Sequence, residues 1–141
     1  MHPFYSSDFS TSVEAAIENA ELKTSCEFKV HLEDYCNEDV FDRAAYVFSE
    51  LGMHKTVARN AILIFIVVQN RKVVILADAG INKVTENFQI QQEVATLTDS
   101  FRAGNFTTGV VQTLDRISTL LSKSFPPQVN DVNEISNSIS R

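Results

Sequence analysis

The stretch NAILIFIVVQNRKVVILAD, residues 60–78, decides the fold. It contains two near-continuous runs of β-branched and aliphatic residues, 60–68 and 72–78, separated by a polar connection too short for a helix. The two runs therefore predict an antiparallel hairpin. Because strands buried on both faces are typically apolar throughout, we expect the rest of the chain to cover both faces of the sheet.

A third strand is predicted upstream of the hairpin by a period-two pattern. Apolar and polar side chains alternate through this segment, as Phe28, Val30 and Leu32 against Glu27, Lys29, His31 and Glu33. The pattern predicts a strand over residues 27–33 with one apolar face and one wetter face.

Apolar side chains spaced three and four residues apart predict four helices. The first is expected over about residues 12–23, because Thr11 and Glu14 match a capping box. The other three are expected over about residues 39–51, between Val84 and Gly104, and over residues 106–121.

The elements follow the order αβαββαα. Because a helix joins the first two strands, we expect them to be parallel, with the third strand antiparallel to the second. The order predicts an α/β fold, a three-layer α/β/α sandwich whose mixed β-sheet has helices on both faces. Periodicity stops after Pro126 and Pro127, so we expect one domain over residues 10–126 and a polar, partly flexible C-terminal tail over residues 127–141.

Composition disfavours several classes of protein. The 141 residues include 18 acidic and 12 basic ones, and the resulting net charge of -6 repels nucleic acid. The longest apolar run, residues 61–68, is far shorter than the roughly 20 residues that cross a bilayer, and the N-terminal residues lack a signal-peptide pattern. We therefore expect a cytoplasmic monomer without membrane insertion. Cys26 and Cys36 bracket one strand, which predicts free thiols.

The predicted topology gathers polar residues at one end of the sheet, where the third strand ends beside the beginnings of the other two. The residues gathered there are Glu21, Thr24, Glu27, Arg59, Asn60 and Asp78. Carboxylate and amide oxygens suit calcium or magnesium, so Glu21, Glu27, Asn60 and Asp78 are the candidate metal ligands. The alternative is that Arg59 pairs with Glu27 or Asp78 and the cluster only closes the end of the sheet.

Two further acidic sets are also candidates. Asp34, Glu38 and Asp39 form a second candidate metal set at the opposite end of the sheet, although Glu38 and Asp39 also suit the N-terminus of the helix that follows. The third set lies in the tail, where it either folds back onto the domain or stays solvated. It consists of Asn130, Asp131, Asn133 and Glu134.

An ordered series of segments between about residues 10 and 135 resembles a known family. The series includes Ala20-Glu21, Arg59-Asn60-Ala61, Asp78-Ala79-Gly80-Ile81 and Phe101-Arg102-Ala103-Gly104-Asn105-Phe106. These segments resemble the TPM domain, the family of the thylakoid-lumen phosphatase-like and photosystem II repair proteins. The resemblance implies a Rossmann-like sandwich, binding of divalent cations, calcium in particular, and an acid phosphatase activity described for some plant members. The family pattern falls on the same six residues at the sheet end.

Three functional hypotheses follow. The favoured one is a regulatory or interaction module that binds calcium, or magnesium, and has no chemistry of its own. The alternative is a metal-assisted acid phosphatase acting on phosphomonoesters, in which Arg59 clamps the anion. The sequence offers no nucleophile for such an enzyme beyond the carboxylates. The third hypothesis, docking onto a protein partner, is suggested by the repair-protein relatives.

Overall fold

Strand β2 (Ala61–Val67) is the centre of the sheet, and all of its residues are buried. The computed structural model describes residues 2–128 and 133–141. Strand β2 pairs in parallel with β1 (Glu27–Glu33) and antiparallel with β3 (Lys72–Ala77). The parallel pair and the hairpin that the sequence predicts are therefore confirmed.

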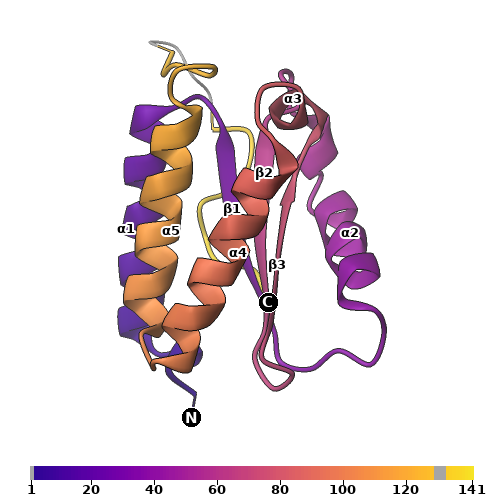
Figure 1. The fold of residues 1–141 in the computed structure, drawn as a ribbon, viewed down its shortest axis with the longest axis vertical. Helices are drawn as coiled ribbons and strands as arrows, with labels where there is room; N and C mark the ends of the chain where they lie inside the picture. Colours follow the sequence, from indigo (N-terminus) through magenta and orange to yellow (C-terminus); the bar gives the residue numbers. More distant parts are fainter. Residues whose placement is uncertain (1, 129–132) are drawn as a thin grey trace.

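Helices cover both faces of this sheet (Figure 1). On one face α1 (Ser7–Lys23), α4 (Asn87–Arg102) and α5 (Phe106–Leu121) enclose the larger core, and α2 (Val40–Glu50) covers the other face. The remaining elements are short and lie in connections, namely η1 (Pro3–Tyr5), η2 (Met53–Lys55) and α3 (Ala79–Asn82). The predicted three-layer α/β/α architecture is confirmed.

Successive side chains of β2 point to opposite faces of the sheet and pack against both outer layers of helices. Ile62, Ile64 and Ile66 pack in the core under α1, α4 and α5, whereas Leu63 and Phe65 pack in the core under α2. Full burial of each such side chain contributes roughly 1.5–3 kcal/mol to folding. No helix in the described part of the chain is long and apolar enough to cross a bilayer, and both cysteines are free thiols.

Helix α1 begins at Ser7, about five residues earlier than predicted. The hydroxyl of Ser6 accepts the Phe9 N–H at 3.1 Å, so Ser6 and not Thr11 is the N-cap, and the predicted capping box at Thr11 is wrong. Phe9 lies four residues before Val13 and is fully buried. Burial of Phe9 therefore extends the apolar stripe, and with it the helix, towards the N-terminus.

Helix α4 begins later than predicted, because Glu86 and Gln89 form a capping box that starts it at Asn87. Val84 lies outside the helix and is exposed, as is Phe88 in its first turn, so the expected apolar face does not extend to them.

The polar face of β1 is covered, contrary to the wetter face predicted for it. Glu27, Lys29 and His31 are all buried, because residues 133–141 lie along the outer edge of β1. Ser140 accepts the Leu32 N–H at 2.8 Å, and its own N–H donates to β1 at 3.1 Å. The described end of the tail therefore folds back onto the domain.

We expect His31 to make the stability of the protein depend on pH. Burial lowers the pKa of His31, and the hydrogen bond with Glu33 opposes this effect only in part. The folded state therefore takes up a proton less readily than the unfolded state, so stability present above about pH 6.5 is lost as the pH falls. Urea unfolding at pH 6.5 and 5.5 should show a larger loss of stability in the wild type than in His31→Gln, with an upper limit of about 1 kcal/mol for the difference.

The pKa of His2 is lowered as well, but His2 titrates in both proteins and cancels from this difference. Equal losses in the wild type and the variant would contradict the role given to His31.

Candidate functional site

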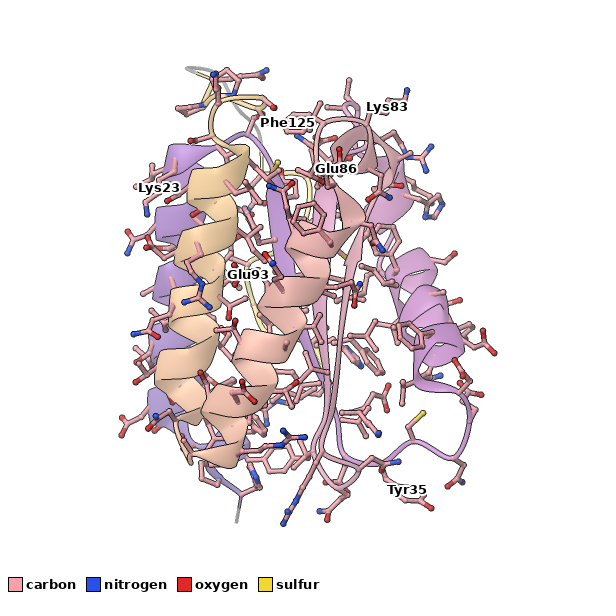
Figure 2. All side chains as sticks on the ribbon, viewed as in Figure 1. Lys23, Tyr35, Lys83, Glu86, Glu93 and Phe125 are labelled. Carbon is pink, nitrogen blue, oxygen red and sulfur yellow. The ribbon has the colours of Figure 1, made fainter. Side chains whose placement is uncertain are left out.

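The candidate site lies where β1 and β2 begin and β3 ends. Glu27 is paired with Ala61 in the register, and the Asp78 N–H donates to the Ala61 carbonyl at 3.0 Å. Glu27, Ala61 and Asp78 therefore form a row across the sheet on the face that α2 covers. This end is uppermost in Figure 2, near Phe125. The sequence correctly predicted that the ends of these three strands meet.

Arg59 and Asp78 form a bidentate ion pair at one end of the row. Arg59 Nε lies 2.7 Å from Asp78 Oδ2, and Arg59 Nη2 lies 2.8 Å from Oδ1, which also accepts the Ala79 N–H. Burial alone would raise the pKa of Asp78, but the hydrogen bonds and charge of Arg59 outweigh it and lower the pKa. Asp78 is thus held ionised, and Arg59 pairs with it as the alternative reading of the cluster requires.

A close approach of two loops holds this ion pair in place. Arg59 has a left-handed φ of +52°, and its carbonyl accepts the Gly80 N–H at 2.9 Å. A Cβ on Gly80 would lie 2.2 Å from the Ala58 carbonyl oxygen. Only glycine fits there, so Gly80 allows the end of β3 to lie close to the loop before β2. Gly80 lies in the first turn of α3, which Asp78 caps.

Glu27 and Asn60 form the buried middle of the site. The Glu27 carboxylate is 2% exposed, and its Oε1 accepts the Glu134 N–H at 2.8 Å. The Glu134 carboxylate in turn accepts the Val57 N–H at 3.3 Å. Asn60 Nδ2 donates to the Ser25 carbonyl at 3.2 Å, which joins the loops before β1 and β2. The described end of the tail is thereby tied to the beginning of the sheet.

Glu21 and Thr24 approach from the end of α1. Glu21 Oε2 accepts the Phe28 N–H at 3.1 Å, on the outer edge of β1. The Thr24 hydroxyl donates to the Phe125 carbonyl and accepts the Cys26 N–H. Glu21 is therefore close to Phe28, the residue after Glu27, whereas Thr24 joins the end of α1 to the segment that follows α5.

The second acidic set is spread over separate contacts. Asp39 caps α2 by accepting the N–H groups of Phe41 and Asp42, and Asp34 accepts the Tyr5 hydroxyl at 2.7 Å. Glu38 accepts the Cys36 thiol through its backbone carbonyl. In the third set, Asn130 and Asp131 lie outside the described residues, and Asn133 Nδ2 bonds to Asn137 Oδ1 at 3.0 Å.

At the sheet end the types of ligand atom suit a hard cation, but these atoms are not arranged around a common position. The oxygens of Glu27, Asn60 and Asp78 are the hard ligands that calcium and magnesium prefer. However, nowhere in residues 2–128 or 133–141 are three or more His, Cys, Asp or Glu side chains placed to hold a metal ion together. Asp78 is turned to Arg59, and Glu27 is turned to the Glu134 N–H. The residue types therefore suit a hard cation. Asp78 could bind one only by giving up its ion pair with Arg59.

Sequence reasoning missed the contact between Glu27 and the Glu134 backbone. No periodic pattern marks residues 133–141, because hydrogen bonds to β1 and two isolated apolar side chains, Ile135 and Ile139, hold them rather than an amphipathic face. Acidic residues in the tail were the one available signal.

Comparisons with known proteins agree with this architecture. A family model described as the TPM domain matches residues 5–120. The BA42 protein of the psychrophilic bacterium Bizionia argentinensis is 35% identical, with a TM-score of 0.91 over 99% of this chain and 97% of that one. The N-terminal domain of a P. gingivalis protein has the same fold at 16% identity, with a TM-score of 0.73 over 88% of this chain and 80% of that one. Among curated proteins, none matches this chain.

Replacement of Gly80 by alanine should destabilise the protein strongly. The added Cβ meets backbone oxygen atoms of Ala58 and Arg59, which cannot rotate away as a side chain would. We expect a loss of about 3 kcal/mol in the free energy of unfolding, measured with urea. Gly104→Ala is the matched control, because Gly104 has a φ of +83° but open space around it, and should lose only about 1 kcal/mol. Equal losses in the two variants would contradict the close approach.

Proposed function

The chain belongs to the TPM domain family, and we propose that it is a divalent-cation-binding module that takes calcium or magnesium at the sheet end. Support comes from the row Glu27, Ala61 and Asp78, in which two carboxylates, 2% and 8% exposed, flank the smallest side chain of β2. Burial of ionised carboxylates is costly, and a nearby cation offsets that cost. Glu27, Asn60 and Asp78 are the proposed ligands.

Charge favours a cation at the same place. The carboxylates of Glu21, Glu27, Asp78 and Glu134 are each held by separate hydrogen bonds at this end of the sheet, where Arg59 supplies a guanidinium. A bound calcium or magnesium ion supplies positive charge here and needs to supply no bond-making chemistry. Because the Glu27 carboxylate also accepts the Glu134 N–H, we expect binding to affect the described end of the tail.

Arg59 is the internal competitor of the ion. Its side chain is 51% exposed, so it can leave Asp78 without opening the core. A cation that takes Asp78 therefore exchanges one positive partner of this carboxylate for another. The cost of that exchange makes Arg59 a determinant of affinity rather than a ligand.

The metal-assisted acid phosphatase stays a prediction and is the less favoured alternative. It requires Arg59 to clamp a phosphoryl oxygen, and two nitrogens of this guanidinium are already bonded to Asp78. A binding module requires only that Asp78 change partners. Docking onto a protein partner and a regulatory role of the ion are likewise predictions.

Removal of the Glu27 charge should weaken ion binding. Glu27→Gln keeps the side-chain volume and an acceptor for the Glu134 N–H, so we expect it to fold. Calcium and magnesium titrations followed by backbone amide NMR should show affinity at least about tenfold lower than in the wild type. Glu18→Gln, the same change at an exposed position of α1, is the control and should bind as the wild type does. Absence of saturable shifts in the wild type below millimolar ion would overturn the proposal.

Arg59 separates the two functions. In a binding module, Arg59→Gln removes the competitor for Asp78 and should raise ion affinity, whereas Arg59→Lys keeps the charge and should leave affinity near that of the wild type. In a phosphatase, Arg59→Gln should abolish hydrolysis of 4-nitrophenyl phosphate in the presence of calcium, magnesium or manganese. Detectable turnover in the wild type that Arg59→Gln removes would support the enzyme, and lower ion affinity in Arg59→Gln would contradict the competitor role.

A further inference from the structure

A pocket of about 500 Å³ lies at the other end of the sheet from the cation site proposed above. Three segments that are distant in sequence meet there, namely the β2–β3 connection, the α4–α5 turn and the N-terminal segment before α1. They lie together at the lower end of the molecule in Figure 1. The volume is within the range of small-molecule sites, about 300–1,000 Å³.

Aromatic rings form one wall of this pocket. The rings of His2 and Phe4 are stacked with centroids 4.7 Å apart, and Phe106 meets His2 edge to face at 4.9 Å. Phe4 is itself 3% exposed and packs edge to face on Phe101. Because the buried Phe4 supports the other rings, the wall is a firm apolar surface suited to a flat ring.

Three cationic side chains also line the pocket, beside aliphatic side chains of β2 and β3. Arg71, Lys72 and Arg102 contribute to the lining, and no acidic residue does, in a chain with 18 acidic and 12 basic residues. Arg102 lies 3.6 Å from Asp99 in an exposed pair, whereas Arg71 and Lys72 make no ion pair within the described part of the chain. The charge of Arg71 also reaches the aromatic wall, because it adds to the effect of burial in lowering the pKa of His2.

We infer that this pocket binds a small organic anion that carries an aromatic ring. The ring lies against His2 and Phe106, and the anionic group, a phosphate, sulfonate or carboxylate, lies among the three cations. Guanidinium groups recognise such oxyanions through paired hydrogen bonds, and Arg71 and Arg102 each supply one guanidinium group. The sequence alone does not suggest this site, because Phe101 and Phe106 have the spacing of core residues in the helices they belong to.

The ligand class is tested with a probe that no phosphatase can hydrolyse. Naphthalene-1-sulfonate, titrated into the isotope-labelled full chain in calcium-free buffer, should give saturable amide shifts centred on Phe4, Lys72 and Phe106. The uncharged 1-naphthalenemethanol and the ringless methanesulfonate should each bind at least about tenfold more weakly, because the first lacks the anionic group and the second lacks the aromatic ring. Equal binding of 1-naphthalenemethanol, or no saturation at millimolar probe, would overturn the inference.

Charge-removal variants locate the anionic group. Lys72 and Arg102 are exposed, so the double variant Lys72→Gln with Arg102→Gln should fold and should bind the probe about tenfold more weakly. Lys83→Gln with Lys123→Gln is the matched control, since it removes the same charge from exposed positions outside the pocket. Lys83 lies at the far end of the molecule (Figure 2). An equal loss in the control pair would show a general charge effect and overturn the site. Failure of calcium binding leaves these outcomes unaffected.

Discussion

The complete burial of β2 is the constraint on which the rest of the structure depends. A strand buried on both faces cannot leave its N–H and C=O groups to water, so each edge needs a partner strand. Strands β1 and β3 meet this need, one parallel and one antiparallel. The side chains of β2 must be covered as well. The isoleucines of β2 face one layer of helices, and Leu63 and Phe65 face the other. Two strands and four helices are thus positioned by one strand of seven residues.

The mixed sheet that results also determines where polar residues can gather. Since β3 runs against β1 and β2, its end meets their beginnings, and Asp78 comes into one row with Glu27. Side chains at strand ends can reach water or loops, so carboxylates are tolerated there and not in the middle of β2. The loop contact between Arg59 and Gly80 then decides which carboxylate receives the guanidinium.

The two ends of the sheet differ in the charged side chains that gather there. At one end Glu27 and Asp78 lie in one row beside the guanidinium of Arg59, and a divalent cation is proposed there. At the hairpin end the pocket contains Arg71, Lys72 and Arg102 beside aromatic rings and no carboxylate. An acidic chain can hold a local positive field when its cations are brought together from separate segments, because such fields depend on position more than on net charge.

Apolar runs, periodic patterns and the length of the connections in the sequence by themselves determined the hairpin, the strand order and the meeting of Glu27, Asn60 and Asp78 at one end, because these features encode local structure and the face that each residue occupies. Only the tertiary structure decided which contacts these residues make. Arg59 pairs with Asp78 because Gly80 permits a backbone approach that no pattern records. The polar face of β1 is buried because the segment around Ser140 adds to its edge through backbone hydrogen bonds, which are independent of side-chain type.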